Sequence, residues 1–340
     1  MKKILTWILL INMCVLLAAC GDKASADKTA GEAGSKADKR TESIQNEQTI
    51  KDSLEQTGNY LYKNVENPTI GSVGGEWTIL GLARSGMDIR DEYFETYFEN
   101  LSAYTAQQGG VLHAKKYTEY SRVILAVTAI DKDPSDVGGF DMLAPLADFE
   151  QTVFQGVNGP AFALLALDAG NYEIPENTVG STQATRELYV DHIINAQLPD
   201  GGWSIGGAAA EVDLTAMVLQ ALAKYQDRKD VEEAVEKGLK VLSESQNENG
   251  GYGADMTESS ESVSQVIVAL TELGISLEDS GFVKKGNTLL DALAQFRLED
   301  GSYSHLKGEE SNLLATEQAF YALVSAERAN QGEASLYRMK

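Results

Sequence analysis

The apolar positions of the chain fall into helical runs separated by polar or glycine-rich turns. In the second half, three runs are apolar on nearly all sides, and each follows a more amphipathic run. The apolar runs are 213–225, 262–275 and 315–327, and the amphipathic runs are 185–197, 230–246 and 283–296. A helix that is apolar all round must be buried. The pattern therefore predicts inner helices that are shielded by outer ones.

Glycine-rich turns of similar sequence join each outer run to the next inner run. They read "QLPDGGWSIG", "QNENGGYGAD" and "RLEDGSYSHL", and their aromatic residues Trp203, Tyr252 and Tyr303 are 49 and 51 residues apart. A period of about 50 residues indicates stacked supersecondary units. Glycine can adopt the left-handed conformation that ends a helix, and the aromatic residue can fill the gap between units.

Less regular copies of the same unit fill the first half. Inner helices are expected at 73–86, 120–130 and 158–170, and outer helices at 48–65, 90–107 and 141–152. The sequence thus predicts an all-α fold of about six helix pairs. Such pairs can close into a ring or form an open solenoid, and periodicity does not choose between the two.

The first residues have the features of a signal peptide. Lys2 and Lys3 precede an apolar stretch over 4–19 that is short for a membrane span. Residues 17–20 ("LAAC") resemble the lipobox of bacterial lipoproteins, in which the peptide is cut before the cysteine and the thiol is acylated. The resemblance implies a signal peptide over 1–19 and a lipid, such as palmitate, on Cys20. The alternative is an ordinary secretory signal with an incidental cysteine.

The segment that follows is polar and rich in alanine, glycine, serine and charged residues. It cannot bury enough apolar surface to offset the entropy of folding, so 20–47 is expected to be a flexible, disordered tether. The folded region is expected over 48–340. By this interpretation the protein is attached to the extracytoplasmic face of a cell membrane through Cys20.

Composition excludes several chemistries. Both cysteines, Cys14 and Cys20, lie in the leader or at its end, so the folded region has no thiol for a disulfide, a nucleophile or a metal. The three histidines, His113, His192 and His305, are far apart in sequence, so neither a metal nor a cofactor is expected. The net charge of −23 makes nucleic acid a poor partner.

The turn sequences resemble the Q-x-x-x-G-x-W motif of squalene and hopene cyclases. Gln197 and Gln246 hold the glutamine position, and Arg297 replaces it in the third copy. The region 48–335 resembles the α/α toroid of terpenoid cyclases, protein prenyltransferases and the helical domain of cobalamin carriers. This resemblance implies a closed (α/α)6 toroid in which the glutamine ties outer helices together.

The stretch "AEVDLTA" resembles the D-x-D-D-T-A motif of class II cyclases, whose central aspartate is the catalytic acid. The match assigns that role to Asp213 and the first aspartate's place to Glu211, but Leu214 departs from the motif. The other interpretation is a helix cap, because Asp is a good N-cap residue. Glu261 occupies the equivalent place in the next repeat, as a shared cap requires, and we favour the cap.

Polar and aromatic residues are expected around one entrance of a central cavity with apolar walls. They are Glu76, Trp77, Tyr120, Asp213, Glu261 and Glu317, joined by Ser121, Phe162 and Ser264. This composition is typical of small-molecule sites. The sequence favours a non-catalytic toroid that binds a small ligand or a protein partner. The alternative is an enzyme of the terpene cyclase or polysaccharide-acting type with Asp213 as general acid.

Overall fold

The computed structural model describes residues 29–253 and 257–340, with the backbone alone for 29–46. The predicted signal peptide (1–19) and the lipidated Cys20 lie outside the described residues. The chain divides into two compact units after residue 45, and residues 46–340 form the helical unit that carries the features below. The regular elements of the described residues are helices, with only isolated β-bridges between loops.

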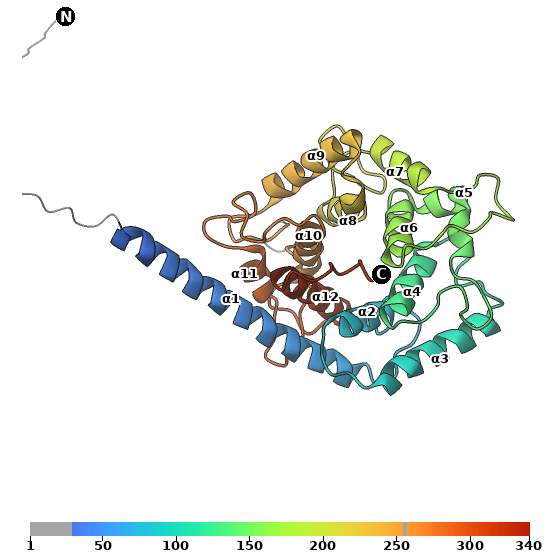
Figure 1. Ribbon diagram of the computed structural model, residues 1–340, viewed down its shortest axis with the longest axis horizontal. Helices are drawn as coiled ribbons and strands as arrows, with labels where there is room; N and C mark the ends of the chain where they lie inside the picture. Colours follow the sequence, from blue (N-terminus) through green and yellow to red (C-terminus); the bar gives the residue numbers. More distant parts are fainter. Residues whose placement is uncertain (1–28, 254–256) are drawn as a thin grey trace, which may run out of the picture. The chain divides into compact units, whose positions relative to one another are not determined.

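Six inner helices form a closed ring, as the resemblance to toroids implied. They are α2 (Glu76–Arg84), α4 (Thr118–Ala129), α6 (Asn158–Ala169), α8 (Val212–Leu222), α10 (Ser260–Glu272) and α12 (Leu313–Asn330). Each packs against the next in chain order, and α12 packs against α2 (Figure 1). The open solenoid is therefore excluded, and the fold is an (α/α)6 toroid.

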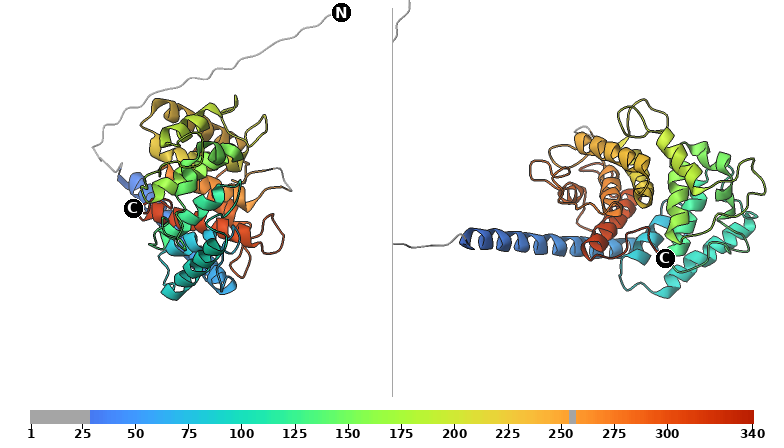
Figure 2. Two further views of the ribbon diagram at one scale, coloured as in Figure 1. Left: turned by 90° about the vertical axis from the view of Figure 1, so that its right-hand side faces the viewer. Right: turned by 45° about the horizontal axis from the view of Figure 1, so that its top comes forward.

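The outer elements lie around this ring, as Figure 1 and the right-hand view of Figure 2 show. They are α1 (Thr29–Asn64), α3 (Asp91–Gln107), α5 (Phe149–Thr152), α7 (Arg186–Asn195), α9 (Lys229–Ser245) and α11 (Leu289–Ala294). Short 3-10 segments complete the set: η1 (Ala144–Ala147), η2 (Val153–Gln155) and η3 (Ala223–Tyr225). Helix α1 begins inside the segment expected to be a disordered tether, whose Ala, Glu and Lys residues are good helix formers. The role of 20–47 as a tether stays a prediction.

Two outer helices are shorter than expected. The segment 141–152 is divided into η1 and α5, because Pro145 lies in the first turn of η1 and Asp148, with an extended backbone, ends η1 and caps α5. The segment 283–296 is helical only in α11, because Lys285 and Gly286 adopt positive φ angles in the turn before it. Turn chemistry outweighed the helical pattern at both places.

The repeated turns hold neighbouring units together. Gln197 donates from Nε2 to the carbonyl of Gly201 (2.8 Å) in its own turn and to Ala234 of α9 (2.9 Å). Gln246 bonds in the same way to Gly250 and Phe282, at 2.9 Å each. Arg297, in the third copy, instead hydrogen-bonds to Gln56 of α1. The motif thus has the tying role that the resemblance implied.

The turn glycines meet the next outer element closely. Gly201, Gly250 and Gly301 have φ angles of +99°, +85° and +88°, and a Cβ at Gly250 would lie 2.5 Å from the carbonyl oxygen of Thr288. The following aromatic residues, of which Trp203 is one, are fully buried between the units. Glycine is needed here both for its backbone conformation and for the close approach.

Candidate functional site

All six inner helices begin at one end of the ring, because every unit repeats the order outer helix, turn, inner helix. We call this end the mouth: it comprises the first turns of the inner helices and the turns that lead into them. We call the opposite end, where the inner helices finish, the base. The C-terminal tail, residues 331–340, lies across the base and bonds to Ala169 and Glu272 at the ends of α6 and α10.

Asp213 lies in the mouth but does not cap its helix. Glu211 is the N-cap residue of α8 and makes no capping bond with its side chain, and Asp213 is the second helical residue. The predicted cap role of Asp213 is therefore wrong. Its carboxyl group accepts a hydrogen bond from Ser262, at the start of the neighbouring α10.

Asp213 is open to solvent, yet the walls of the mouth surround its carboxyl group. This partial desolvation raises the pKa of Asp213 above its ordinary value, and the Ser262 hydrogen bond and the charge of His305 oppose the rise. A solvent-accessible carboxyl group with a raised pKa has the properties of a proton donor.

Glu261 and His305 are hydrogen-bonded to each other beside Asp213. The imidazole Nδ1 of His305 lies 2.9 Å from both carboxylate oxygens of Glu261. His305 belongs to the turn before α12, and its carbonyl oxygen accepts from the amide of Ser260 at the start of α10. We call Asp213, Glu261, Ser262 and His305 the Asp213 cluster. It joins α8, α10 and the turn before α12.

Aromatic rings lie beneath the mouth, inside the ring of helices. Trp77 of α2 contacts Phe162 of α6 (centroids 5.9 Å apart) and Tyr321 of α12 (5.6 Å). Helices α2 and α6 are not neighbours in the ring, so the Trp77–Phe162 contact crosses the centre. Tyr321 interacts electrostatically with Asp213 and Glu261, which places its hydroxyl group near the Asp213 cluster.

Polar side chains also bridge the inner helices. Gln265 of α10 donates from Nε2 to the hydroxyl of Tyr321 (2.5 Å) and to Gln318 Oε1 (3.0 Å), and Gln220 of α8 donates to Gln265 Oε1 (2.9 Å). The apolar cavity walls expected from the sequence are therefore replaced, on this side, by a hydrogen-bonded chain.

Glu76 and Glu317 do not reach the mouth surface. Glu317 is buried at the seam where α12 meets α2 and closes the ring, and Glu76 is buried nearby, on the side of α2 that faces α4. Glu76 lies 3.4 Å from Nε of Arg122, and Glu317 accepts from the amide of Gly74 (3.0 Å) and from Thr78. Burial raises the pKa of each carboxyl group to about 7.

The remaining candidates are structural. Tyr120 is buried, and its hydroxyl accepts from the amide of Leu112, which holds the turn before α4. Ser121 and Ser264 bond to carbonyl groups of their own helices. Of the predicted ligand residues, only Asp213 and Glu261 meet in the mouth, with Trp77 beneath them.

Sequence reasoning missed His305 and Tyr321. His305 was considered only as a residue far in sequence from the other histidines, although it follows the aromatic residue of a repeated turn by two positions. Turn residues of consecutive units meet at one end of a toroid, and that signal could have paired it with Glu261.

Two absences apply to the described residues. Within 29–253 and 257–340, no three His, Cys, Asp or Glu side chains are placed to hold a metal ion. In the same residues, no helix combines the length and the apolar character that crossing a bilayer requires.

Comparison with known proteins supports the fold and leaves the activity open. No known family profile matches the sequence, and no curated protein does. Among solved structures, unsaturated glucuronyl hydrolase from Bacillus sp. GL1, described as responsible for degradation of glycosaminoglycan, is similar at a TM-score of 0.53 and 11% identity, covering 85% of this chain and 98% of that one.

Two further solved structures are similar to the same extent. A polysaccharide lyase has a TM-score of 0.52 and 12% identity over 84% of this chain and 98% of its own. The type II terpene cyclase MstE from Scytonema has a TM-score of 0.52 and 11% identity over 83% and 99%. At this identity the likeness shows the toroid fold, which all three enzymes share with this chain.

Proposed function

We propose that the protein is an enzyme that cleaves a glycosidic bond of a polysaccharide at the Asp213 cluster. The observation that carries the proposal is the state of Asp213. Its carboxyl group is open to solvent, caps no helix, has a raised pKa and lies beside a second carboxylate that is paired with an imidazole. Structural carboxylates rarely combine these features, whereas general acids need them.

The cluster can supply both proton transfers of glycoside hydrolysis. Asp213, when protonated, gives its proton to the glycosidic oxygen as the bond to the anomeric carbon breaks. Water attacks that carbon and loses a proton to the imidazole of His305, and the Glu261 carboxylate stabilises the imidazolium ion that forms. Exchange with solvent at the open mouth then returns both groups to their starting state.

The interior of the ring favours a sugar over an isoprenoid. A carbocation in cyclisation needs a dry apolar pocket that excludes water. Here Trp77, Phe162 and Tyr321 meet across the centre, and Gln265 bridges two helices beside them. An aromatic floor below carboxylates and a hydroxyl group suits the alternating apolar and polar faces of a sugar ring.

The negative charge of the mouth also indicates which charge a polysaccharide substrate can carry. Asp213 and Glu261 bring two carboxyl groups to the site, and the whole chain carries a net charge of −23. Uronate-rich polymers would be repelled by this field. We therefore expect a neutral or amino-bearing polysaccharide.

The test compares wild type with Asp213→Asn and, as a matched control, Asp91→Asn in the first turn of α3. Reducing ends and unsaturated products released from neutral, amino-bearing and uronate polysaccharides are measured, which separates hydrolysis from elimination. Loss of a general acid lowers kcat about 10²- to 10⁴-fold. Asp91→Asn should leave kcat unchanged.

Two results would overturn the proposal: no polysaccharide is cleaved by wild type, or Asp213→Asn retains full activity. Binding of a saccharide or a cationic solute without turnover would instead support the second candidate, a non-catalytic binding toroid. The accessible carboxylates of the mouth favour that candidate because they suit cationic groups.

We also propose that lipid on Cys20 attaches the protein to the outer face of a cell membrane. The lipobox-like sequence "LAAC" supports this attachment. Stable anchoring needs more than one acyl chain. Cys20→Ser should move the protein from the membrane fraction to the soluble fraction, and the mass of the mature N-terminal peptide should fall by that of the acyl groups. An unchanged distribution would refute lipid attachment.

A further inference from the structure

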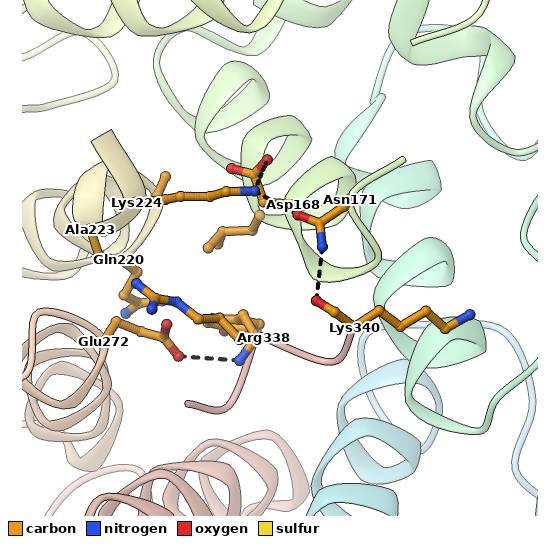
Figure 3. A pocket seen from close by; sticks show the side chains of 11 residues that line it. Asp168, Asn171, Gln220, Ala223, Lys224, Glu272, Arg338 and Lys340 are labelled. Atoms are coloured by element: carbon orange, nitrogen blue, oxygen red, sulfur yellow. Dashed lines mark hydrogen bonds and ion pairs between the residues drawn. The ribbon is translucent and has the colours of Figure 1, made fainter. Parts of the chain in front are cut away.

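The base of the ring contains a cavity that lies away from the Asp213 cluster. Its volume is about 280 Å³, close to the lower limit of about 300 Å³ for ligand pockets and large enough for one sugar-sized molecule. The walls come from the ends of α6, α8 and α10 and from the tail (Figure 3). The charged residues that line it are Asp168, Lys224, Glu272, Arg338 and Lys340.

The first carboxylate of this cavity is fully engaged by the protein. Oδ1 of Asp168 accepts from Arg186 Nε (2.8 Å) and Lys224 Nζ (3.0 Å), and Oδ2 accepts from the hydroxyl of Tyr225 (2.6 Å). Two cations thus face this one carboxylate. Asn171 accepts a further bond from Lys224 (2.9 Å).

The second carboxylate is engaged by the tail. Glu272 accepts from the hydroxyl of Ser335 (2.6 Å) and from the amide of Tyr337 (3.2 Å). It also interacts electrostatically with Arg84 and Arg338. Both cavity carboxylate side chains therefore have their partners within the chain.

Arg338 is exposed to solvent, and its guanidinium group is not engaged by another side chain of the cavity. Among the described residues, its guanidinium group makes no hydrogen bond or close ion pair, and its side chain extends across the cavity toward Gln220 and Ala223 (Figure 3). A guanidinium group has five N–H donors in a planar fork that matches carboxylate and phosphate. The cavity thus offers the N–H donors of one cationic group, Arg338, to a ligand.

The helix dipole does not account for this arrangement. Cations are expected near helix C-termini, and Lys224 directly follows α8 in that position. Arg338 belongs to no helix and is carried there by the tail. We propose that the base binds a small organic anion, a carboxylate or a phosphate on a sugar-sized molecule, through Arg338 and Lys224.

The experiment measures binding by calorimetry with four probes: glucuronate, glucose 6-phosphate, inorganic phosphate and uncharged glucose. The variants are Arg338→Gln, Arg338→Lys and a control of equal charge, Lys240→Gln on the exposed face of α9. Wild type and Lys240→Gln should bind an anionic probe alike. Arg338→Gln should weaken binding about tenfold, and Arg338→Lys less, because it keeps the charge without the fork.

The probes distinguish the source of the anion. Binding of glucuronate alone identifies a carboxylate ligand, and binding of the phosphates alone identifies a phosphate ligand. The proposal is overturned if no anion binds, if glucose binds equally well, or if Arg338→Gln and Lys240→Gln weaken binding alike. Thermal unfolding of each variant checks that the fold is kept. Polysaccharide cleavage plays no part in this assay, so its result does not depend on the proposed function.

Discussion

The two ends of the ring differ in the charged groups near their helix termini. The mouth has carboxylates in the first turns of its helices, at Glu76, Asp213 and Glu261, whereas the base has cations near helix ends, at Arg84 and Lys224. The helix macrodipole favours this distribution. Charge at a toroid end therefore does not by itself identify a site.

What differs between the ends is which group has a property that the helix dipole does not account for. At the mouth this group is Asp213, which is neither a cap nor deeply buried and has a raised pKa. At the base it is Arg338, which stands on the tail. Candidate sites on this scaffold are therefore groups whose pKa or position differs from what the dipoles of the parallel inner helices favour.

The ends also differ in how they are covered, because the tail spans the base. Leu336 and Tyr337 are buried there, and Tyr337 interacts electrostatically with Tyr321 on the mouth side. Tyr337→Ala should lower the free energy of unfolding by about 3–5 kcal/mol, as other buried aromatic truncations do. Urea denaturation measures this. Tyr337→Phe, which keeps the ring, is the control, and a loss below about 1 kcal/mol in Tyr337→Ala would show that the tail does not seal the base.

Two buried carboxyl groups, at and beside the seam between α2 and α12, should make the free energy of unfolding depend on pH. Glu76 and Glu317 have pKa values raised to about 7 when folded, from 4.5. Their protonated forms therefore favour the folded state, so this stability is fully present below about pH 4.5 and is lost as pH rises through 7. The loss is up to about 3 kcal/mol for each group.

Glu317→Gln isolates this effect. The amide resembles the protonated carboxyl group, so the variant should match wild type near pH 5 and exceed its free energy of unfolding near pH 8. Denaturation curves across that range, with exposed Glu95→Gln as control, give the difference. If wild type and Glu317→Gln change in parallel with pH, the seam is not the cause.

The sequence predicted the architecture because each unit is specified locally. Apolar inner runs, amphipathic outer runs and the glycine turns of Trp203 and Tyr252 are all visible in neighbouring residues. Closure of the ring was not visible in periodicity and came from the resemblance. The outer helix at 141–152 was overestimated because the pattern did not weigh Pro145 and Asp148 against it.

The site was harder to predict than the fold because it is made between units. Asp213 and Glu261 were found from one helix each, but their partners Ser262 and His305 come from the next repeat. The base cavity was not found, because Arg338 reaches it only through the course of the tail. Glu76 lies in the first turn of α2, as expected, whereas Glu317 lies one turn inside α12, and burial keeps both from the surface of the mouth.

The smallest predicted effect, on the free energy of unfolding, distinguishes a helix-capping role of Asp213 from a role as an acid. Ser259 is the true cap of α10, since its hydroxyl accepts from the amide of Ser262 (3.2 Å). Ser259→Ala should cost about 1 kcal/mol of unfolding free energy. Asp213→Asn removes no cap, so it should change that free energy by less than about 0.5 kcal/mol, and the raised pKa of Asp213 favours a slight gain. Urea denaturation at pH 7 measures the free energy of unfolding of both variants. If Asp213→Asn loses as much of this free energy as Ser259→Ala does, Asp213 has a structural role, and the mouth has no candidate for the general acid.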